Sequence, residues 1–277
     1  MSATAPDTLE SDAAWQWLCR LRDHERPPED DRLWLDAQGA WQARDAVGDA
    51  TRELLDCLVP LATHRERLAV AQLGQSLDGR IATQSGHSHY INGLESRTHL
   101  HRLRALLDAV VVGAGTVVAD DPLLTVRHVP GRQPVRVILD PRGRVPGHVR
   151  LLRDAAAPTL HLVGPDTMPA TPTGRHVTRL TLPLAGDGFS PAAVLEALAE
   201  RGLPRVLIEG GGVTVSRFLE AGVLDRLHLL VAPLLIGSGR PGLTLAPIAT
   251  LDDARRPRAR TFRCGDDTLF DLILRNA

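Results

Sequence analysis

The sequence predicts an α/β protein with a mostly parallel, mixed β-sheet covered by helices on both faces, and three observations predict it. From Arg67 onward, short apolar runs alternate with segments of helical spacing. The connections between them are short, which is typical of parallel sheets. The last two runs flank Gly265-Asp266 as an antiparallel hairpin would. Residues 1–65 lack this alternation, and we expect them to form a small helical N-terminal extension.

The extension, residues 1–65, contains all four tryptophans of the chain. Ala13–Leu21 and Ala46–Leu58 have the spacing of amphipathic helices. Pro60 is expected to end the second helix, because proline interrupts the helical hydrogen bonding. Apart from packing on the main domain or on a partner subunit, the sequence predicts no role for this segment.

The main domain is expected at residues 66–277, with strands in the apolar runs and helices between them. Ser190 and Pro191 are a typical cap and first residue of a helix. The predicted strands are Leu68–Leu73, Ala109–Val112, Val135–Leu139, Thr159–Val163, Arg205–Ile208 and Leu227–Ala232, followed by a hairpin of Thr261–Cys264 and Thr268–Leu274. The predicted helices are Leu94–Leu107, Pro191–Glu200 and Val213–Glu220.

Composition excludes several classes of protein. The net charge of −1 favours neither a nucleic acid nor a membrane partner, and no apolar run is long enough to cross a bilayer. With no signal pattern at the N-terminus, we expect a cytoplasmic protein. The chain contains no lysine. Anions must therefore be bound by arginine side chains, backbone N–H groups or helix N-termini.

Two glycine-containing turns are the strongest functional signals. Glu209-Gly210-Gly211-Gly212 joins a predicted buried strand to a helix, and Gly113-Ala114-Gly115-Thr116 follows another strand. Glycines allow close backbone approach to a ligand, and a helix N-terminus binds phosphate. Two such turns could hold the two ends of one dinucleotide, whereas the alternative is a pair of ordinary tight turns.

Other polar segments have simpler interpretations. Asp78-Gly79 and Asp120-Asp121 are typical of turns or caps, and Arg104 could form a surface ion pair with Asp108. His64-Arg65-Glu66 matches half of a zinc deaminase signature but lacks its cysteines, so we expect neither deaminase chemistry nor a metal. The paired histidines His87/His89 and His99/His101 are expected to be isolated polar or buried side chains rather than ligands.

Taken in order, these segments resemble the reductase domain of the bifunctional riboflavin-pathway deaminase/reductase and its stand-alone relatives, from about Arg67 to the C-terminus. The stretches that carry the resemblance are Leu73–Ile81, Ser85–Ser88, Leu103–Ala105, Gly115–Arg127, Ile138–Asp140, Glu209–Gly211, Ala221–Asp225 and Ala232–Gly237. The resemblance implies a dihydrofolate-reductase-like fold and a homodimer. It also implies hydride transfer from NADPH to ribose C1′ of 5-amino-6-(5-phosphoribosylamino)uracil, which gives the ribitylamino product.

The resemblance also implies the site residues. The substrate would contact Gln72, Ser88, Arg104, Leu124, Arg127 and Glu209. The cofactor would contact Gly74, Tyr90, Gly115, Thr116, Asp120, Gly210, Gly211, Gly212, Val213, Thr214 and Arg217. Glu209 and Asp78 are the candidate catalytic residues. Arginine forks at Arg104 and Arg127 suit the ribose 5-phosphate.

Two positions depart from the family pattern. Gln72 stands where the family commonly has a lysine, and Tyr90 stands where many relatives have tryptophan. The loss of a charge at position 72 leaves open a reductase of the same fold that acts on another pyrimidine or pteridine-like substrate. A catalytically inactive nucleotide-binding protein is the third alternative. Arg142 and Arg217 are the candidates for the 2′-phosphate of NADPH, with NADH as the alternative cofactor.

Overall fold

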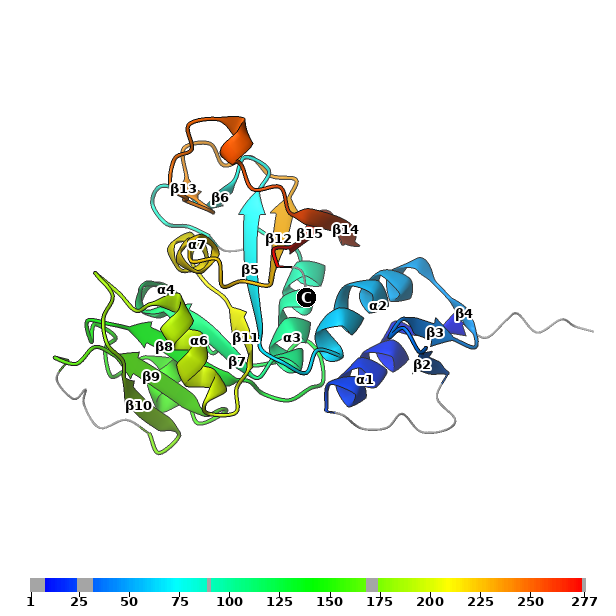
Figure 1. Cartoon of the computed structure of the whole chain (residues 1–277), viewed down its shortest axis with the longest axis horizontal. Coiled ribbons are helices and arrows are strands. Elements are labelled where there is room, and N and C mark those ends of the chain that lie inside the picture. The colour runs from blue at the N-terminus through cyan, green and yellow to red at the C-terminus, as the bar shows by residue number, and fades with distance from the viewer. Residues whose placement is uncertain (1–7, 24–31, 89–90, 168–173, 276–277) are drawn as a thin grey trace, which may run out of the picture. The chain divides into compact units, whose positions relative to one another are not determined.

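A computed structural model of the chain describes residues 8–23, 32–88, 91–167 and 174–275 (Figure 1). The chain divides into two compact units, Met1–Arg65 and Glu66–Ala277. No helix among the described residues is both long and apolar enough to span a bilayer.

The first unit contains two helices that pack on each other, α1 (Ser11–Arg22) and α2 (Asp49–Ala62). Both predicted helices are confirmed. Pro60 does not end the second one, which continues to Ala62. A proline this close to a helix end removes only one late hydrogen bond. The guanidinium of Arg65 donates to the carbonyls of Leu21 and Ala62 and so ties the ends of both helices together.

Four short strands complete the first unit. β1 (Thr8–Leu9) pairs in parallel with β4 (Ala46–Val47). β2 (Leu33–Leu35) pairs antiparallel with β3 (Trp41–Ala43). The expectation that a helix begins at Ala46 is therefore wrong, since the first residues of that range belong to β4.

The second unit is built on a nine-stranded sheet with the order β10-β9-β8-β7-β11-β5-β12-β15-β14 (Figure 1). Neighbouring strands are parallel, except that β15 is antiparallel to both β12 and β14. The predicted mixed sheet and closing hairpin are confirmed. The strands are β5 (Leu68–Ser76), β7 (Ala109–Gly113), β8 (Val135–Asp140), β9 (Thr159–Val163), β10 (Val177–Thr181), β11 (Arg205–Ile208), β12 (Arg226–Ala232), β14 (Arg258–Cys264) and β15 (Asp267–Ile273).

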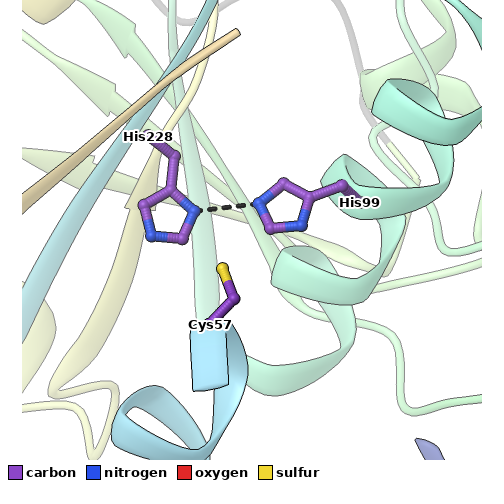
Figure 2. A group of neighbouring side chains, drawn as sticks. All are labelled: Cys57, His99 and His228. Carbon is purple, nitrogen blue, oxygen red and sulfur yellow. Dashed lines mark hydrogen bonds between the residues drawn. The ribbon is translucent and has the colours of Figure 1, made fainter. Parts of the chain in front are cut away.

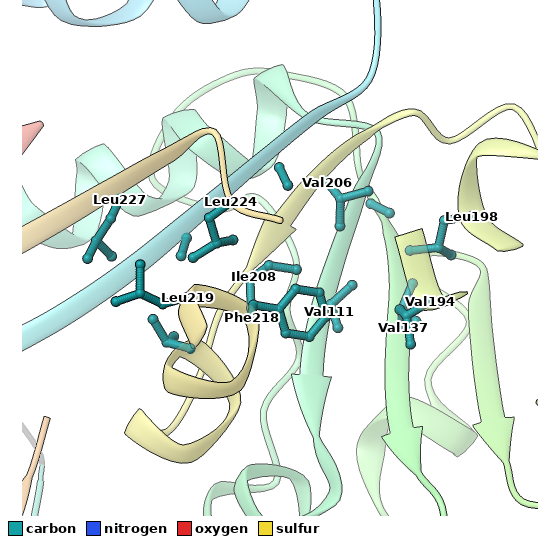
Figure 3. Close-up of a cluster of buried hydrophobic side chains, with 14 of the residues drawn as sticks. Val111, Val137, Val194, Leu198, Val206, Ile208, Phe218, Leu219, Leu224 and Leu227 are labelled. Atoms are coloured by element: carbon teal, nitrogen blue, oxygen red, sulfur yellow. The ribbon is translucent and has the colours of Figure 1, made fainter. Parts of the chain in front are cut away.

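One face of the sheet is covered by α6 (Pro191–Ala199) and α7 (Gly212–Glu220), which lie in front of it in Figure 1. The hydroxyl of Ser190 accepts a hydrogen bond from the N–H of Ala193, and this confirms the predicted cap. Alternate residues of the strands meet the apolar sides of both helices in one buried cluster (Figure 3). Its members include Val111, Val137, Val194, Leu198, Val206, Ile208, Phe218, Leu219, Leu224 and Leu227.

The opposite face is covered by α3 (Leu94–Leu106). Leu227 belongs to the cluster beneath α7, so its neighbour His228 points to the other side of β12. There the Nδ1 atom of His228 lies 2.9 Å from Nε2 of His99 on α3 (Figure 2). The prediction of helices on both faces is confirmed.

Shorter elements complete the second unit. β6 (Arg80–Ala82) pairs antiparallel with β13 (Arg240–Pro241). The helices α4 (Ala114–Asp120) and α5 (Arg150–Arg153) and the 3₁₀ helix η1 (Leu251–Asp253) lie in the connections. Among the described residues, Asp121 and Leu124 are the non-glycine residues with positive φ. Both lie in the segment that follows α4.

Candidate functional site

The two glycine turns lie side by side at one edge of the sheet. β7 and β11 are adjacent and parallel, so their carboxyl ends meet at the same edge. The Oγ1 atom of Thr116 in α4 accepts a hydrogen bond of 3.1 Å from the N–H of Gly211 and joins the two turns. In open α/β sheets ligands bind at this edge. The structure thus brings together the two turns that the sequence predicts to act as a pair.

Glycine is required at two positions of the second turn. Gly210 has a φ of +120°, which a residue with a side chain rarely adopts. A Cβ on Gly212 would lie 1.7 Å from the carbonyl oxygen of Gly242. No side chain caps the N-terminus of α7 at Gly211, and Val213 in its first turn is 68% exposed. The first turn of this helix therefore suits a phosphate group.

Arg104 and Glu209 form a two-pronged ion pair next to these turns. Nε of Arg104 donates to Oε2 of Glu209 at 2.9 Å, and Nη2 donates to Oε1 at 2.5 Å. The side chains are only 6% and 12% exposed. The predicted surface pair of Arg104 with Asp108 is wrong, because Asp108 binds the guanidinium of Arg205 instead.

The segment from Asp121 to Arg127 contains two more of the expected substrate residues, Leu124 and Arg127. Nη1 of Arg104 donates to the carbonyl of Thr125 at 2.9 Å, and Nη1 of Arg127 donates to the hydroxyl of the same residue at 3.2 Å. Leu124 is buried with a φ of +55°. Arg127 itself is exposed. Residues that the family resemblance assigns to the substrate, and that are distant in sequence, thus share one small region.

The electrostatic balance of this region is positive. The pKa of Arg127 is lowered by partial burial and then by the nearby charges of Arg104 and Arg150, while Glu209 acts in the opposite direction. Three guanidinium groups therefore lie near two carboxylates, those of Glu209 and Asp121, which pair with Arg104 and Arg150. The excess of positive charge favours an anion such as a phosphate ester.

Asp78 holds two loops together. Its carboxylate accepts hydrogen bonds from the hydroxyl of Ser76 and from the backbone N–H groups of Ile236 and Gly237. These bonds, with that of Ser76 first, lower the pKa of Asp78 to about 2. An acid of this pKa is ionised at neutral pH and has no proton to give. Its contacts support a structural role, and the expected catalytic role stays a prediction.

Further expected residues come from β5 and the loop that follows it. In the parallel pairing of β11 with β5, Ile208 lies opposite Ala71, so Gln72 and Glu209 follow directly on neighbouring strands. Gln72 is buried on the α3 face, in register with His228. A Cβ on Gly74 would lie 1.9 Å from the side-chain oxygen of Asn92, so a side chain at this position would displace that amide. Ser88 is half-buried in the loop after β6. Tyr90 lies outside the described residues.

The remaining cofactor candidates lie on α4 and α7. Gly115 and Asp120 are exposed on α4, and Thr214 follows Val213 in the first turn of α7. Arg217, further along α7, binds the carboxylate of Asp187 at 2.7 Å. The pKa of Asp187 is lowered first by Arg217 and to a smaller extent by Arg142. Both candidates for the 2′-phosphate are therefore near one acidic side chain that the sequence did not single out.

Sequence reasoning also missed His101, Thr125 and Arg150 at this site. The Nδ1 atom of His101 accepts the backbone N–H of Arg127, and Arg150 binds Asp121 through both its backbone N–H and its guanidinium. His101 and Arg104 are three residues apart on α3, a spacing that places both on one helix face. That spacing was the only local signal for the role of His101.

The order and direction of the strands define a dihydrofolate-reductase-like α/β fold. The chain belongs to the RibD C-terminal domain family, whose model matches residues 68–267.

Curated relatives with this domain have riboflavin-pathway names. The 2,5-diamino-6-ribosylamino-4(3H)-pyrimidinone 5′-phosphate reductase of Methanothermobacter thermautotrophicus is 34% identical over 214 residues, which cover 74% of this chain and 97% of that protein. The riboflavin biosynthesis protein RibD of Aquifex aeolicus is 35% identical over 192 residues, or 69% of this chain and 53% of that protein. The chain thus spans about half the length of this RibD relative.

A solved structure agrees with this assignment. The diaminohydroxyphosphoribosylaminopyrimidine deaminase/5-amino-6-(5-phosphoribosylamino)uracil reductase of Thermotoga maritima superimposes with a TM-score of 0.64 at 26% identity. The match covers 82% of this chain and 63% of that one.

Proposed function

We propose that this chain is a pyrimidine reductase of riboflavin biosynthesis that uses NADPH to reduce ribose C1′ of a phosphoribosylamino-pyrimidine to the ribityl product. The single observation that carries the proposal is the position of the Arg104–Glu209 pair beside the joined glycine turns, in a chain of the RibD C-terminal domain family. The arginine-containing ion pair and the two glycine turns would therefore bind the substrate and the dinucleotide side by side at one edge of the sheet.

The cofactor end of the site fits a dinucleotide. No side chain caps the N-terminus of α7, and Val213 in its first turn is exposed, so the backbone N–H groups of that turn would bind a pyrophosphate. The hydrogen bond from the N–H of Gly211 to the hydroxyl of Thr116 fixes the distance between the two glycine turns. When bound, NADPH would supply the hydride, so the protein chiefly has to orient the nicotinamide toward the acceptor carbon.

The substrate end of the site fits a sugar phosphate. Arg127 would bind the 5-phosphate through charged hydrogen bonds, and the nearby positive charge of Arg104 would strengthen them. Each oxygen of Glu209 already accepts one bond from Arg104 and retains capacity for a second. Glu209 would therefore accept a ribose hydroxyl and fix the sugar, because a carboxylate locked against a guanidinium is held in one orientation.

The identity of the pyrimidine depends on Gln72, which stands where the family commonly has a lysine. The relatives are named for a diamino-pyrimidinone and for an aminouracil, which differ by one deamination step. We propose the aminouracil as substrate. The diamino compound, or another pyrimidine or pteridine-like compound, is the alternative that Gln72 motivates.

The test is NADPH oxidation by the purified chain with each of the two phosphoribosylamino-pyrimidines, followed by nicotinamide absorbance. We expect turnover with the aminouracil. Arg127→Ala should raise KM by the loss of about 1.5–3 kcal/mol of a charged hydrogen bond. No oxidation with either compound would refute the proposal. Activity that appears only in Gln72→Lys would show that the natural substrate is a different compound.

We also propose that the chain acts as a homodimer. Light scattering on the purified protein tests this directly, and a monomeric mass at micromolar concentration would contradict it.

A further inference from the structure

The segment Asp121–Arg127 is a strained backbone that its surroundings hold in place. Asp121 has a φ of 39° and Leu124 a φ of 55°, and neither is a glycine. Residues in this region cost about 1–2 kcal/mol each and persist only where neighbouring groups fix them. Strain of this kind concentrates at ligand sites. The side chains that fix Asp121–Arg127 would therefore shape any ligand site that this segment forms.

Several side chains from other elements fix the segment. Arg150 donates its backbone N–H and its Nε atom to the carboxylate of Asp121 at 2.7 and 3.2 Å. The amide of Gln133 binds both the N–H and the carbonyl of Val126. At the far end, Nδ1 of His101 accepts the backbone N–H of Arg127 at 2.9 Å.

His101 anchors the main chain of Arg127, the residue whose guanidinium is expected to bind phosphate. It lies on α3 three residues before Arg104, and its side chain is buried. One helix face thus holds the main chain of Arg127 through His101 and the carbonyl of Thr125 through Arg104. The geometry of the phosphate site is set by this pair of contacts, since both fix the backbone that carries Arg127.

The chemistry of the contact requires a neutral imidazole. A backbone N–H can only donate, so Nδ1 must be unprotonated and the ring proton must reside on Nε2. The surroundings maintain that state. Burial first, and then the charges of Arg104, His128, Arg127 and Arg97, lower the pKa of His101 to about 3. The ring also packs edge-on against His128, with 4.5 Å between ring centroids.

We propose that His101 is a positioning residue for the substrate phosphate. As a neutral acceptor it fixes the main chain of Arg127, so that this guanidinium and that of Arg104 converge on one anion. The proposal rests on the proposed function only for the identity of that anion. His101 itself touches neither substrate nor cofactor, and it acts through Arg127.

The test compares His101→Asn with His101→Leu in the full chain. The oxygen of asparagine can occupy the place of Nδ1, whereas leucine removes the acceptor. We expect His101→Leu to raise KM for the phosphorylated substrate about tenfold, with little change in kcat and little change toward the dephosphorylated substrate, because one hydrogen bond is lost. His101→Asn should stay within about twofold of the wild type. Equal KM values for all three proteins, or equal losses on both substrates, would overturn the proposal.

A second measurement does not depend on turnover. Amide hydrogen exchange at Arg127 in the free protein should be slow in the wild type and in His101→Asn but fast in His101→Leu. Calorimetric titration with ribose 5-phosphate should follow the same order. If the chain binds ribose 5-phosphate in this order but oxidises no NADPH, only the proposed function fails. If exchange at Arg127 is the same in all three, the positioning role fails whatever the activity.

His101→Gln covers the case in which the leucine variant does not fold. Its amide keeps a polar group in the buried position but carries the oxygen one bond too far from the helix to meet the N–H of Arg127. We expect the leucine phenotype from this variant. Wild-type KM and wild-type exchange in His101→Gln would overturn the proposal.

Discussion

The ion pair between Arg104 and Glu209 makes a quantitative prediction. Glu209→Gln replaces one carboxylate oxygen by an NH₂ group, which would face a guanidinium that can only donate. Arg104 then stays 6% exposed with its charge uncompensated. Breaking a buried pair by removing one partner costs about 3–5 kcal/mol. Because Thr125 still accepts from Arg104 and Glu209 is 12% exposed, we expect a smaller cost, about 2–3 kcal/mol.

Urea unfolding of the wild type and Glu209→Gln measures this cost. A control comes from Arg67 and Glu196, which lie 3.9 Å apart and are 64% and 63% exposed. Glu196→Gln should change the free energy of unfolding by less than about 0.5 kcal/mol. A double-mutant cycle with Arg104→Met should give a coupling energy of about 1–3 kcal/mol. An unchanged urea midpoint in Glu209→Gln would show that the pair is not desolvated as described.

Three further predictions follow from the same structure. Gly212→Ala should lower the free energy of unfolding by about 1–3 kcal/mol in urea titrations, because its Cβ would overlap the carbonyl of Gly242. Acidification from pH 7 to 5 should also destabilise the protein. Burial lowers the pKa of His99 well below 6.5, so below that pH only the unfolded chain takes up its proton. The loss approaches about 1.4 kcal/mol per pH unit and should shrink in His99→Gln, as urea titrations at each pH would show. Asp187→Asn should release Arg217 and lower KM for NADPH about two- to fivefold, but not KM for NADH, in steady-state assays.

Each of these predictions has its own control. Gly115→Ala adds a Cβ that meets nothing within 4 Å in a helix, so its free energy of unfolding should equal or exceed that of the wild type by up to about 1 kcal/mol. A pH dependence identical in the wild type and His99→Gln would contradict the role given to His99. Equal changes of KM for both cofactors in Asp187→Asn would exclude Arg217 as the ligand of the 2′-phosphate.

Elements with strong local signals were predicted well. α6 begins at Pro191 after the Ser190 cap, and β9 runs over Thr159–Val163 as its apolar composition indicates. β10 (Val177–Thr181) was missed. It is an edge strand with half-exposed positions, so it lacks the apolar pattern that marks a buried strand. Apolar periodicity in a sequence indicates which residues are buried, and a strand at the edge of a sheet buries few of its side chains.

Candidate site residues show the same division. The glycine turns and Arg104 were identified in the sequence, from pattern and from resemblance. The partner of Arg104 was not identified. Sequence spacing favoured Asp108, four residues along the same helix, whereas the actual partner, Glu209, is 105 positions away in the sequence. His101 was missed for a related reason. An imidazole that accepts a single backbone N–H has no sequence signature beyond its spacing from Arg104.

By itself, the sequence determined the alternation of strands and helices, the family resemblance and the need for arginine and backbone N–H groups in a chain without lysine. These follow from periodicity, composition and short motifs, which are local properties. Only the tertiary structure decided that Thr116 joins the two glycine turns, that Glu209 binds Arg104 and that His101 fixes Arg127. Those contacts depend on strand order and helix placement, since parallel strands distant in sequence bring their carboxyl ends to one edge.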